Sequence, residues 1–69
     1  MKIVLYSTGC PKCKVLEKKL TDKGIPYTLE TNVDKLIELG FQMAPILEIN
    51  GQFMEFADAN KYLNDWSNN

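Results

Sequence analysis

The stretch Ile3-Val4-Leu5-Tyr6-Ser7-Thr8-Gly9-Cys10-Pro11-Lys12-Cys13 decides the fold of this chain. Residues 2–6 are nearly all apolar and rich in β-branched and aromatic types, which is typical of a strand covered on both faces. Ser7 to Gly9 form a loop. Pro11 suits the first position of a helix, because its missing N–H would be unpaired there anyway. The stretch therefore predicts a strand, a turn and a helix, with two thiols at the turn.

The first helix is predicted to run from Pro11 to Lys23. Its apolar stripe has the i, i+3, i+7 spacing of a helix face that packs on a core. The stripe consists of Cys13, Leu16 and Leu20, widened by Val15. Gly24 is a good C-terminal stop for this helix, and Pro26 prevents the helix from continuing.

The rest of the chain predicts three further strands and two further helices. The strands span 27–30, 46–49 and 52–55, and the helices span 33–39 and 57 to about 66. Asn50-Gly51 indicates a hairpin, since both central residues of a type I′ turn need positive φ. The element order is β-α-β-α-β-β-α, with a parallel crossover first and an antiparallel pair later. Ser67-Asn68-Asn69 is expected to be a frayed tail.

Helical and strand periodicity predict which later side chains face the core. The expected inward residues are Val33, Leu36, Ile37 and Leu39 in the middle helix, and Ala59, Tyr62, Leu63 and Trp66 in the last. In the hairpin, Leu47 and Met54 should share one face of the sheet, with Glu48 and Phe53 on the other. Apolar residues on both faces of a strand pair fit a sheet with helices on both sides.

Bulk composition narrows the class of protein. Sixty-nine residues make one domain, spanning 1–69, with no room for a second core. A net charge of −1 argues against general nucleic-acid binding. The longest apolar runs are too short to span a membrane. Met1-Lys2 leads straight into a strand with no signal-peptide pattern, so the expected location is the cytoplasm.

Charge is unevenly distributed along the chain, and the thiols lie at its basic end. Residues 1–24 carry six lysines and two acids, whereas residues 25–69 carry two lysines and seven acids. Lys12 and Lys14 either help to stabilise a thiolate or are simply part of the solvated helix surface.

A disulfide between two cysteines this close in sequence closes a tiny loop and stabilises a fold little. The spacing therefore favours redox chemistry over a structural bridge.

With these motifs in place, the chain resembles the glutaredoxin-like branch of the thioredoxin superfamily. The resemblance is carried by Thr8-Gly9-Cys10-Pro11-Lys12-Cys13, by Met43-Ala44-Pro45-Ile46 and by Asn50-Gly51. It implies an α/β, thioredoxin-like fold with a four-stranded mixed sheet and helices on both faces. It also implies that Pro45 is cis and lies against the dithiol. The backbone of Ala44 would then pair with a bound peptide or glutathione.

Two departures from the glutaredoxin pattern affect the expected reductant. Glu55-Phe56 stands where glutaredoxins carry a Gly-Gly pair that lets the backbone approach glutathione, although Asp58 matches the acidic residue that follows the pair. Ser7 stands where they usually carry a basic residue. The sequence is therefore closer to redoxins that are reduced by thioredoxin reductase and feed ribonucleotide reductase. Tyr6 and Phe56 could flank the substrate groove or could be core aromatics.

The resemblance assigns thiol–disulfide exchange to the two cysteines. Cys10 would be the nucleophile, because unpaired N–H groups and the helix dipole stabilise a thiolate at a helix N-terminus. Cys13, more buried, would resolve the mixed disulfide with the protein substrate. Pro11 would shape the turn, and Lys12 would add a modest, screened positive field. We expect a monomer that binds no metal and no cofactor and uses the Cys10–Cys13 disulfide, with glutathione as a possible co-substrate.

The main alternative is a soft-metal, copper-type binding or chaperone domain that uses the same two thiols. Such domains prefer methionine two residues before the first cysteine, and here that residue is Thr8. An iron–sulfur cluster bridged between two copies with external thiols is a second alternative. A structural zinc site needs four ligands, which two cysteines and no histidine do not supply.

Overall fold

A computed structural model describes residues 2–66, and the tail predicted from Ser67 onward lies outside the described residues. The elements are β1 (Ile3–Tyr6), α1 (Pro11–Asp22), β2 (Thr28–Glu30), α2 (Val33–Glu38), β3 (Ile46–Ile49), β4 (Gln52–Met54) and α3 (Phe56–Asn64). This is the element order predicted from the sequence, and each boundary differs from the prediction by at most two residues. In the described part of the chain, no helix is long and apolar enough to cross a membrane.

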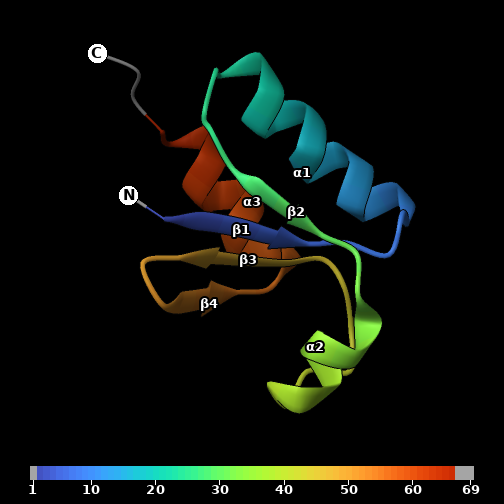
Figure 1. The fold of residues 1–69 in the computed structure, drawn as a ribbon. Helices are drawn as coiled ribbons and strands as arrows, with labels where there is room; N and C mark the ends of the chain where they lie inside the picture. Colours follow the sequence, from blue (N-terminus) through green and yellow to red (C-terminus); the bar gives the residue numbers. More distant parts are fainter. Residues whose placement is uncertain (1, 67–69) are drawn as a thin grey trace.

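The four strands form one mixed sheet in the order β2-β1-β3-β4 (Figure 1). β1 pairs with β2 in parallel, because α1 returns the chain to the same end of the sheet before β2 begins. β1 pairs with β3 antiparallel, and β3 pairs with β4 antiparallel through the hairpin. Tyr6 stands opposite Ile46 in this register. The carboxyl end of β1 therefore lies beside the start of β3.

The two faces of the sheet have separate apolar clusters. On one face, Ile3 and Leu5 of β1 pack with α1 and α3 through Leu16, Leu20, Ala59 and Leu63. On the other face, Val4 and Tyr6 pack with Ile46 and with Leu36 of α2. Figure 1 shows α2 apart from the other two helices, below the sheet at the end where β1 finishes. The predicted α/β, thioredoxin-like fold with helices on both faces is confirmed.

The hairpin between β3 and β4 has the geometry that its sequence predicts. Asn50 and Gly51 both have positive φ, at 51° and 86°. The backbone N–H of Lys2 donates a hydrogen bond to the Asn50 side-chain oxygen at 2.9 Å, which ties the turn to the start of β1. Leu47 pairs with Met54 and Glu48 with Phe53, as the sequence indicated.

Several residues that were predicted to face the core do not. Of the four expected in the middle helix, only Leu36 is buried, while Val33, Ile37 and Leu39 are exposed. The reason is that α2 is short and stands at the end of the sheet, so only one of its sides meets another element. Val15 and Tyr62 are also exposed, because α1 and α3 bury only a narrow stripe. Trp66 packs against the larger cluster from beyond the end of α3.

Tyr6 is a buried aromatic on the α2 side of the sheet. Its hydroxyl donates a hydrogen bond to the Glu48 carboxylate at 2.7 Å. Burial, this hydrogen bond and the negative charges of Glu48 and Glu30 raise the pKa of Tyr6 to about 12. The ring also lies 6.5 Å from the ring of Phe53, centroid to centroid. These contacts assign Tyr6 a structural part in the sheet.

Replacing a fully buried side chain of α1 should destabilise the protein far more than replacing an exposed one. Leu20→Ala is expected to lower the free energy of unfolding by about 2–5 kcal/mol, because it leaves a cavity in the larger cluster. Val15→Ala is the matched control on the same helix, and it should change the free energy by less than about 0.5 kcal/mol. Urea denaturation followed by circular dichroism measures both. Equal effects would contradict the observed packing of α1.

Tyr6 should also make stability fall at high pH. The folded protein keeps the Tyr6 proton up to a pKa of about 12, against 10.0 for an unperturbed tyrosine. The contribution of Tyr6 to the free energy of unfolding is therefore fully present below about pH 10 and is lost as the pH rises through about 12. Tyr6→Phe should flatten that loss and cost about 1 kcal/mol at neutral pH through the missing hydrogen bond. Urea denaturation across pH 7–12, with Tyr62→Phe as the control, tests both expectations.

Candidate active site

Cys10 is the N-cap residue of α1, with extended backbone geometry (φ −70°, ψ 163°). Pro11 follows in the first turn, as its fixed φ and missing N–H allow. The backbone N–H of Cys13 donates a hydrogen bond to the sulfur of Cys10 at 3.1 Å. The carbonyl of Cys10 accepts the first helical hydrogen bond, from the N–H of Lys14, at 3.0 Å. The sulfur of Cys10 thus occupies the place where a capping side chain normally stands.

The two cysteines are joined by a disulfide, with their Cα atoms 5.0 Å apart. One helical turn brings the Cys13 side chain back to the N-terminus of α1, which is why two intervening residues suffice. The Cys13 side chain is fully buried, in line with the helical stripe that it shares with Leu16 and Leu20. Cys10 is only partly buried. An incoming molecule can therefore reach Cys10 more easily than Cys13.

The turn before Cys10 is held by its own backbone and by one buried hydroxyl. The N–H of Ser7 donates to the Glu30 carbonyl at 2.9 Å, which ties the end of β1 to the end of β2. The Ser7 hydroxyl accepts a hydrogen bond from the N–H of Gly9 at 3.1 Å. Ser7 is almost completely buried, so the position where glutaredoxins carry a basic residue holds a turn-closing hydroxyl here.

A second loop meets the dithiol from the other side. The Ala44–Pro45 peptide bond is cis, and Pro45 is fully buried. The carbonyl oxygen of Ala44 lies 3.9 Å from the sulfur of Cys10. Thr8, in the loop after β1, places its hydroxyl 3.9 Å from the sulfur of Cys13. The dithiol is therefore flanked by Thr8 and Ala44, and a contact of Thr8 with Cys13 was not predicted from the sequence.

The structure also places the other residues that were singled out from the sequence. The ammonium of Lys12 sits over the ring of Phe56, 5.3 Å from its centroid, so α1 and α3 are linked above the larger core cluster. Asp58 is exposed in the first turn of α3, where its negative charge suits the helix dipole. Tyr6 contacts Glu48 and Phe53 instead of the cavity beside the dithiol.

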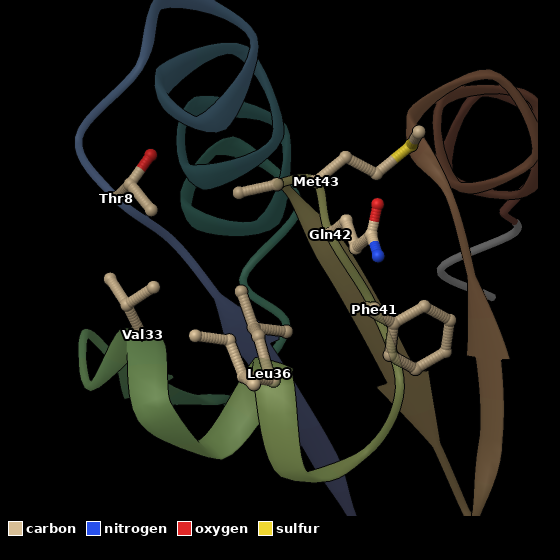
Figure 2. Close-up of a pocket in the computed structure, with 8 residues that line it drawn as sticks. Thr8, Val33, Leu36, Phe41, Gln42 and Met43 are labelled. Carbon is tan, nitrogen blue, oxygen red and sulfur yellow. The ribbon is translucent and has the colours of Figure 1, made fainter.

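A cavity of about 450 Å³ adjoins the dithiol on the side of α2. Its lining residues come from the loop after β1, from α2 and from the loop before β3: Thr8, Val33, Leu36, Ile37, Phe41, Gln42, Met43 and Ala44. In Figure 2, Val33 and Leu36 point from α2 toward the hollow and Thr8 lies across from them, whereas the Met43 side chain extends away from all three. Helical periodicity predicted Val33, Leu36 and Ile37 to face a core, and no sequence pattern indicated this cavity.

For a metal ion, the two thiols are the candidate protein ligands at this site. In residues 2–66, no group of three or more histidine, cysteine, aspartate or glutamate side chains is placed to hold a metal ion. Cys10 and Cys13 are the only cysteines of the chain. A soft ion would thus have two protein sulfurs and no third side chain of these types within reach.

Comparison with known proteins supports the same reading of the dithiol. No protein-family model matches the chain, and no solved structure matches it significantly. A curated protein named thioredoxin, from Methanothermobacter thermautotrophicus strain Delta H, is 34% identical over 58 residues, which covers 75% of each chain. Three observations point to the same family: the fold, the disulfide between Cys10 and Cys13, and the identity to this relative. The chain therefore belongs to the thioredoxin superfamily and has a thiol–disulfide redox role.

Proposed function

We propose that this protein reduces disulfides in other proteins, with Cys10 as nucleophile and Cys13 as resolving residue. The observation that carries the proposal is the asymmetry of the two sulfurs. Cys10 is partly exposed and accepts a backbone hydrogen bond at the N-terminus of α1, whereas Cys13 is fully buried. In the reduced protein the same N–H group and the positive end of the helix dipole stabilise a thiolate on Cys10.

The proposed exchange proceeds in two steps. The Cys10 thiolate attacks one sulfur of the substrate disulfide, forms a mixed disulfide and releases the other substrate sulfur as a thiolate. Cys13 then loses its proton and attacks the sulfur of Cys10, which closes the Cys10–Cys13 disulfide. The remaining substrate sulfur leaves as a thiolate and takes up a proton. Two electrons pass from the dithiol to the substrate, and an external reductant must return them.

We further propose thioredoxin reductase, and not glutathione, as that reductant. Phe56 has a bulky, partly buried side chain where a glycine would let the glutathione backbone approach, and Lys12 covers its ring. Glu55 adds an exposed negative charge beside it, which disfavours a ligand that carries two carboxylates. Ser7 is buried and supplies no cation.

In this proposal the protein acts as a cytoplasmic monomer without a bound cofactor. The reducing environment of the cytoplasm keeps such dithiols available for exchange. Its substrate would be a disulfide-containing protein, and ribonucleotide reductase is our candidate, on the basis of the sequence resemblance to redoxins that serve that enzyme.

Serine substitutions should separate the parts played by the two cysteines. Cys10→Ser is expected to abolish disulfide reduction, because the remaining thiol is buried. Cys13→Ser should accumulate the mixed disulfide between Cys10 and the substrate, because no resolving thiol remains. Insulin reduction measures activity, and non-reducing electrophoresis with mass spectrometry detects the trapped adduct. Activity in both variants equal to that of the wild type would rule out the mechanism.

The choice of reductant can be tested by comparing two coupled assays on one disulfide substrate. Electrons supplied by NADPH and thioredoxin reductase should give a rate well above that with NADPH, glutathione reductase and glutathione. Replacing Glu55 and Phe56 together by glycine should raise the glutathione-dependent rate, since both obstacles to that ligand are removed. Circular dichroism checks that the double variant still folds. A wild-type preference for glutathione would contradict the proposal.

The same assays with purified ribonucleotide reductase as acceptor test the proposed partner.

A further inference from the structure

The two sulfurs of the dithiol have different polar neighbours. The sulfur of Cys10 accepts a hydrogen bond from the backbone N–H of Cys13 at 3.1 Å. The sulfur of Cys13 lies 3.9 Å from the hydroxyl oxygen of Thr8. Because a disulfide sulfur carries no proton, the hydroxyl is the donor of this contact in the oxidised protein, and the Cys13 sulfur is the acceptor. Thr8 therefore offers Cys13 the kind of contact that the helix backbone offers Cys10.

Cys13 needs such a contact whenever its sulfur carries a negative charge. This sulfur attacks Cys10 as a thiolate when the mixed disulfide is resolved, and it leaves as a thiolate when a reductant attacks Cys10. The Cys13 side chain is fully buried, so the charge loses its hydration. An ionised group that is buried without a hydrogen-bond partner is costly, and a protein group must therefore stabilise this thiolate.

The carboxylates of the described residues are engaged elsewhere. None of them is fully buried, and three are partly buried: Glu17, Glu30 and Glu48. Glu48 accepts the hydrogen bond from Tyr6, and Glu30 forms an ion pair with Lys35. Glu17 lines a polar hollow between α1 and the residue that precedes β2. The chain has no histidine, so the hydroxyl beside the Cys13 sulfur remains as the group that can stabilise its charge.

Thr8 connects this buried sulfur with water. It is an exposed residue in the loop between β1 and α1, although its hydroxyl contacts a sulfur that water does not reach. In Figure 2 the hydroxyl oxygen lies on the side of Thr8 that is nearer α1. A hydroxyl can donate one hydrogen bond and accept two. The Thr8 hydroxyl can therefore donate to Cys13 while it accepts a hydrogen bond from solvent.

We propose that Thr8 is a catalytic residue of the exchange, and that its hydroxyl stabilises the Cys13 thiolate by donating a hydrogen bond. When the mixed disulfide is resolved, the thiol proton of Cys13 passes to water and the hydroxyl donates to the ionised sulfur. That sulfur then forms a bond with the sulfur of Cys10, and the substrate sulfur leaves with the electron pair. The inference rests on the proposed function, because it concerns the second step of that reaction.

The same contact acts when the oxidised protein is reduced. A thiolate of the reductant forms a bond with the sulfur of Cys10, the Cys10–Cys13 bond breaks, and Cys13 leaves with the electron pair. The hydroxyl of Thr8 donates to this leaving sulfur, as it already does in the disulfide. Both directions of the exchange should therefore depend on the hydroxyl.

Two substitutions at residue 8 separate the hydroxyl from the rest of the side chain. Thr8→Val keeps the shape and removes the hydroxyl, whereas Thr8→Ser keeps the hydroxyl. Reduced protein is mixed with a symmetric peptide disulfide and quenched with acid, and mass spectrometry follows the mixed disulfide. Thr8→Val should slow its decay about tenfold and leave its formation unchanged, the size of effect expected for a hydrogen bond to a charged group. Thr8→Ser should decay at nearly the wild-type rate.

Reduction of the oxidised protein by dithiothreitol is a second measurement, followed by alkylation of the freed thiols. Thr8→Val should slow this reaction by a similar factor, because Cys13 is then the leaving sulfur. Thr21→Val is the matched control, since Thr21 is an exposed threonine at the far end of α1. It should leave both rates at the wild-type value. Circular dichroism checks that each variant folds, which the exposure of Thr8 favours.

Three outcomes are decisive. Wild-type decay of the mixed disulfide in folded Thr8→Val would overturn this inference and leave the proposed function intact. So would a loss in Thr8→Ser as large as in Thr8→Val, since the hydroxyl would then not be its cause. Absence of a mixed disulfide in both wild-type protein and Cys13→Ser would instead overturn the proposed function itself.

Discussion

The hydrogen bond from the N–H of Cys13 to the sulfur of Cys10 is the interaction on which the redox site depends. It forms only if Cys10 stands at the N-cap of α1, and that position is fixed by the strand before it and the helix after it. β1 is buried on both faces and paired on both edges, with β2 and with β3, which fixes its place in the sheet. Pro11 then starts the helix at once, so the sulfur of Cys10 is the group available to satisfy the unpaired N–H.

Strand pairing brings the second half of the site to this sulfur. Because β1 and β3 are antiparallel and Tyr6 is opposite Ile46, the residues just after β1 lie next to the residues just before β3. Thr8 and Ala44 are far apart in the sequence, yet both reach the dithiol through this register. The site is thus a consequence of sheet order, and a register shift of one residue would separate its two loops.

Local signals allowed the element order and the two cysteines to be predicted, since capping, periodicity and the Asn50-Gly51 turn act over a few residues. Periodicity also showed that Leu16 and Leu20 share a face of α1 with Cys13. It could not show whether another element covers a face, and for this reason Val33 and Ile37 were wrongly assigned to the core. The part played by Thr8 depends on a three-dimensional contact with Cys13 that the sequence spacing does not reveal.

The small size of the chain makes the exposed side of α2 informative. A chain of 69 residues has little apolar burial to spare. α2 contacts the sheet through its one buried side chain, Leu36, and through an ion pair between Lys35 and Glu30 of β2. About half of Val33 and most of Ile37 remain exposed in the cavity beside the redox site.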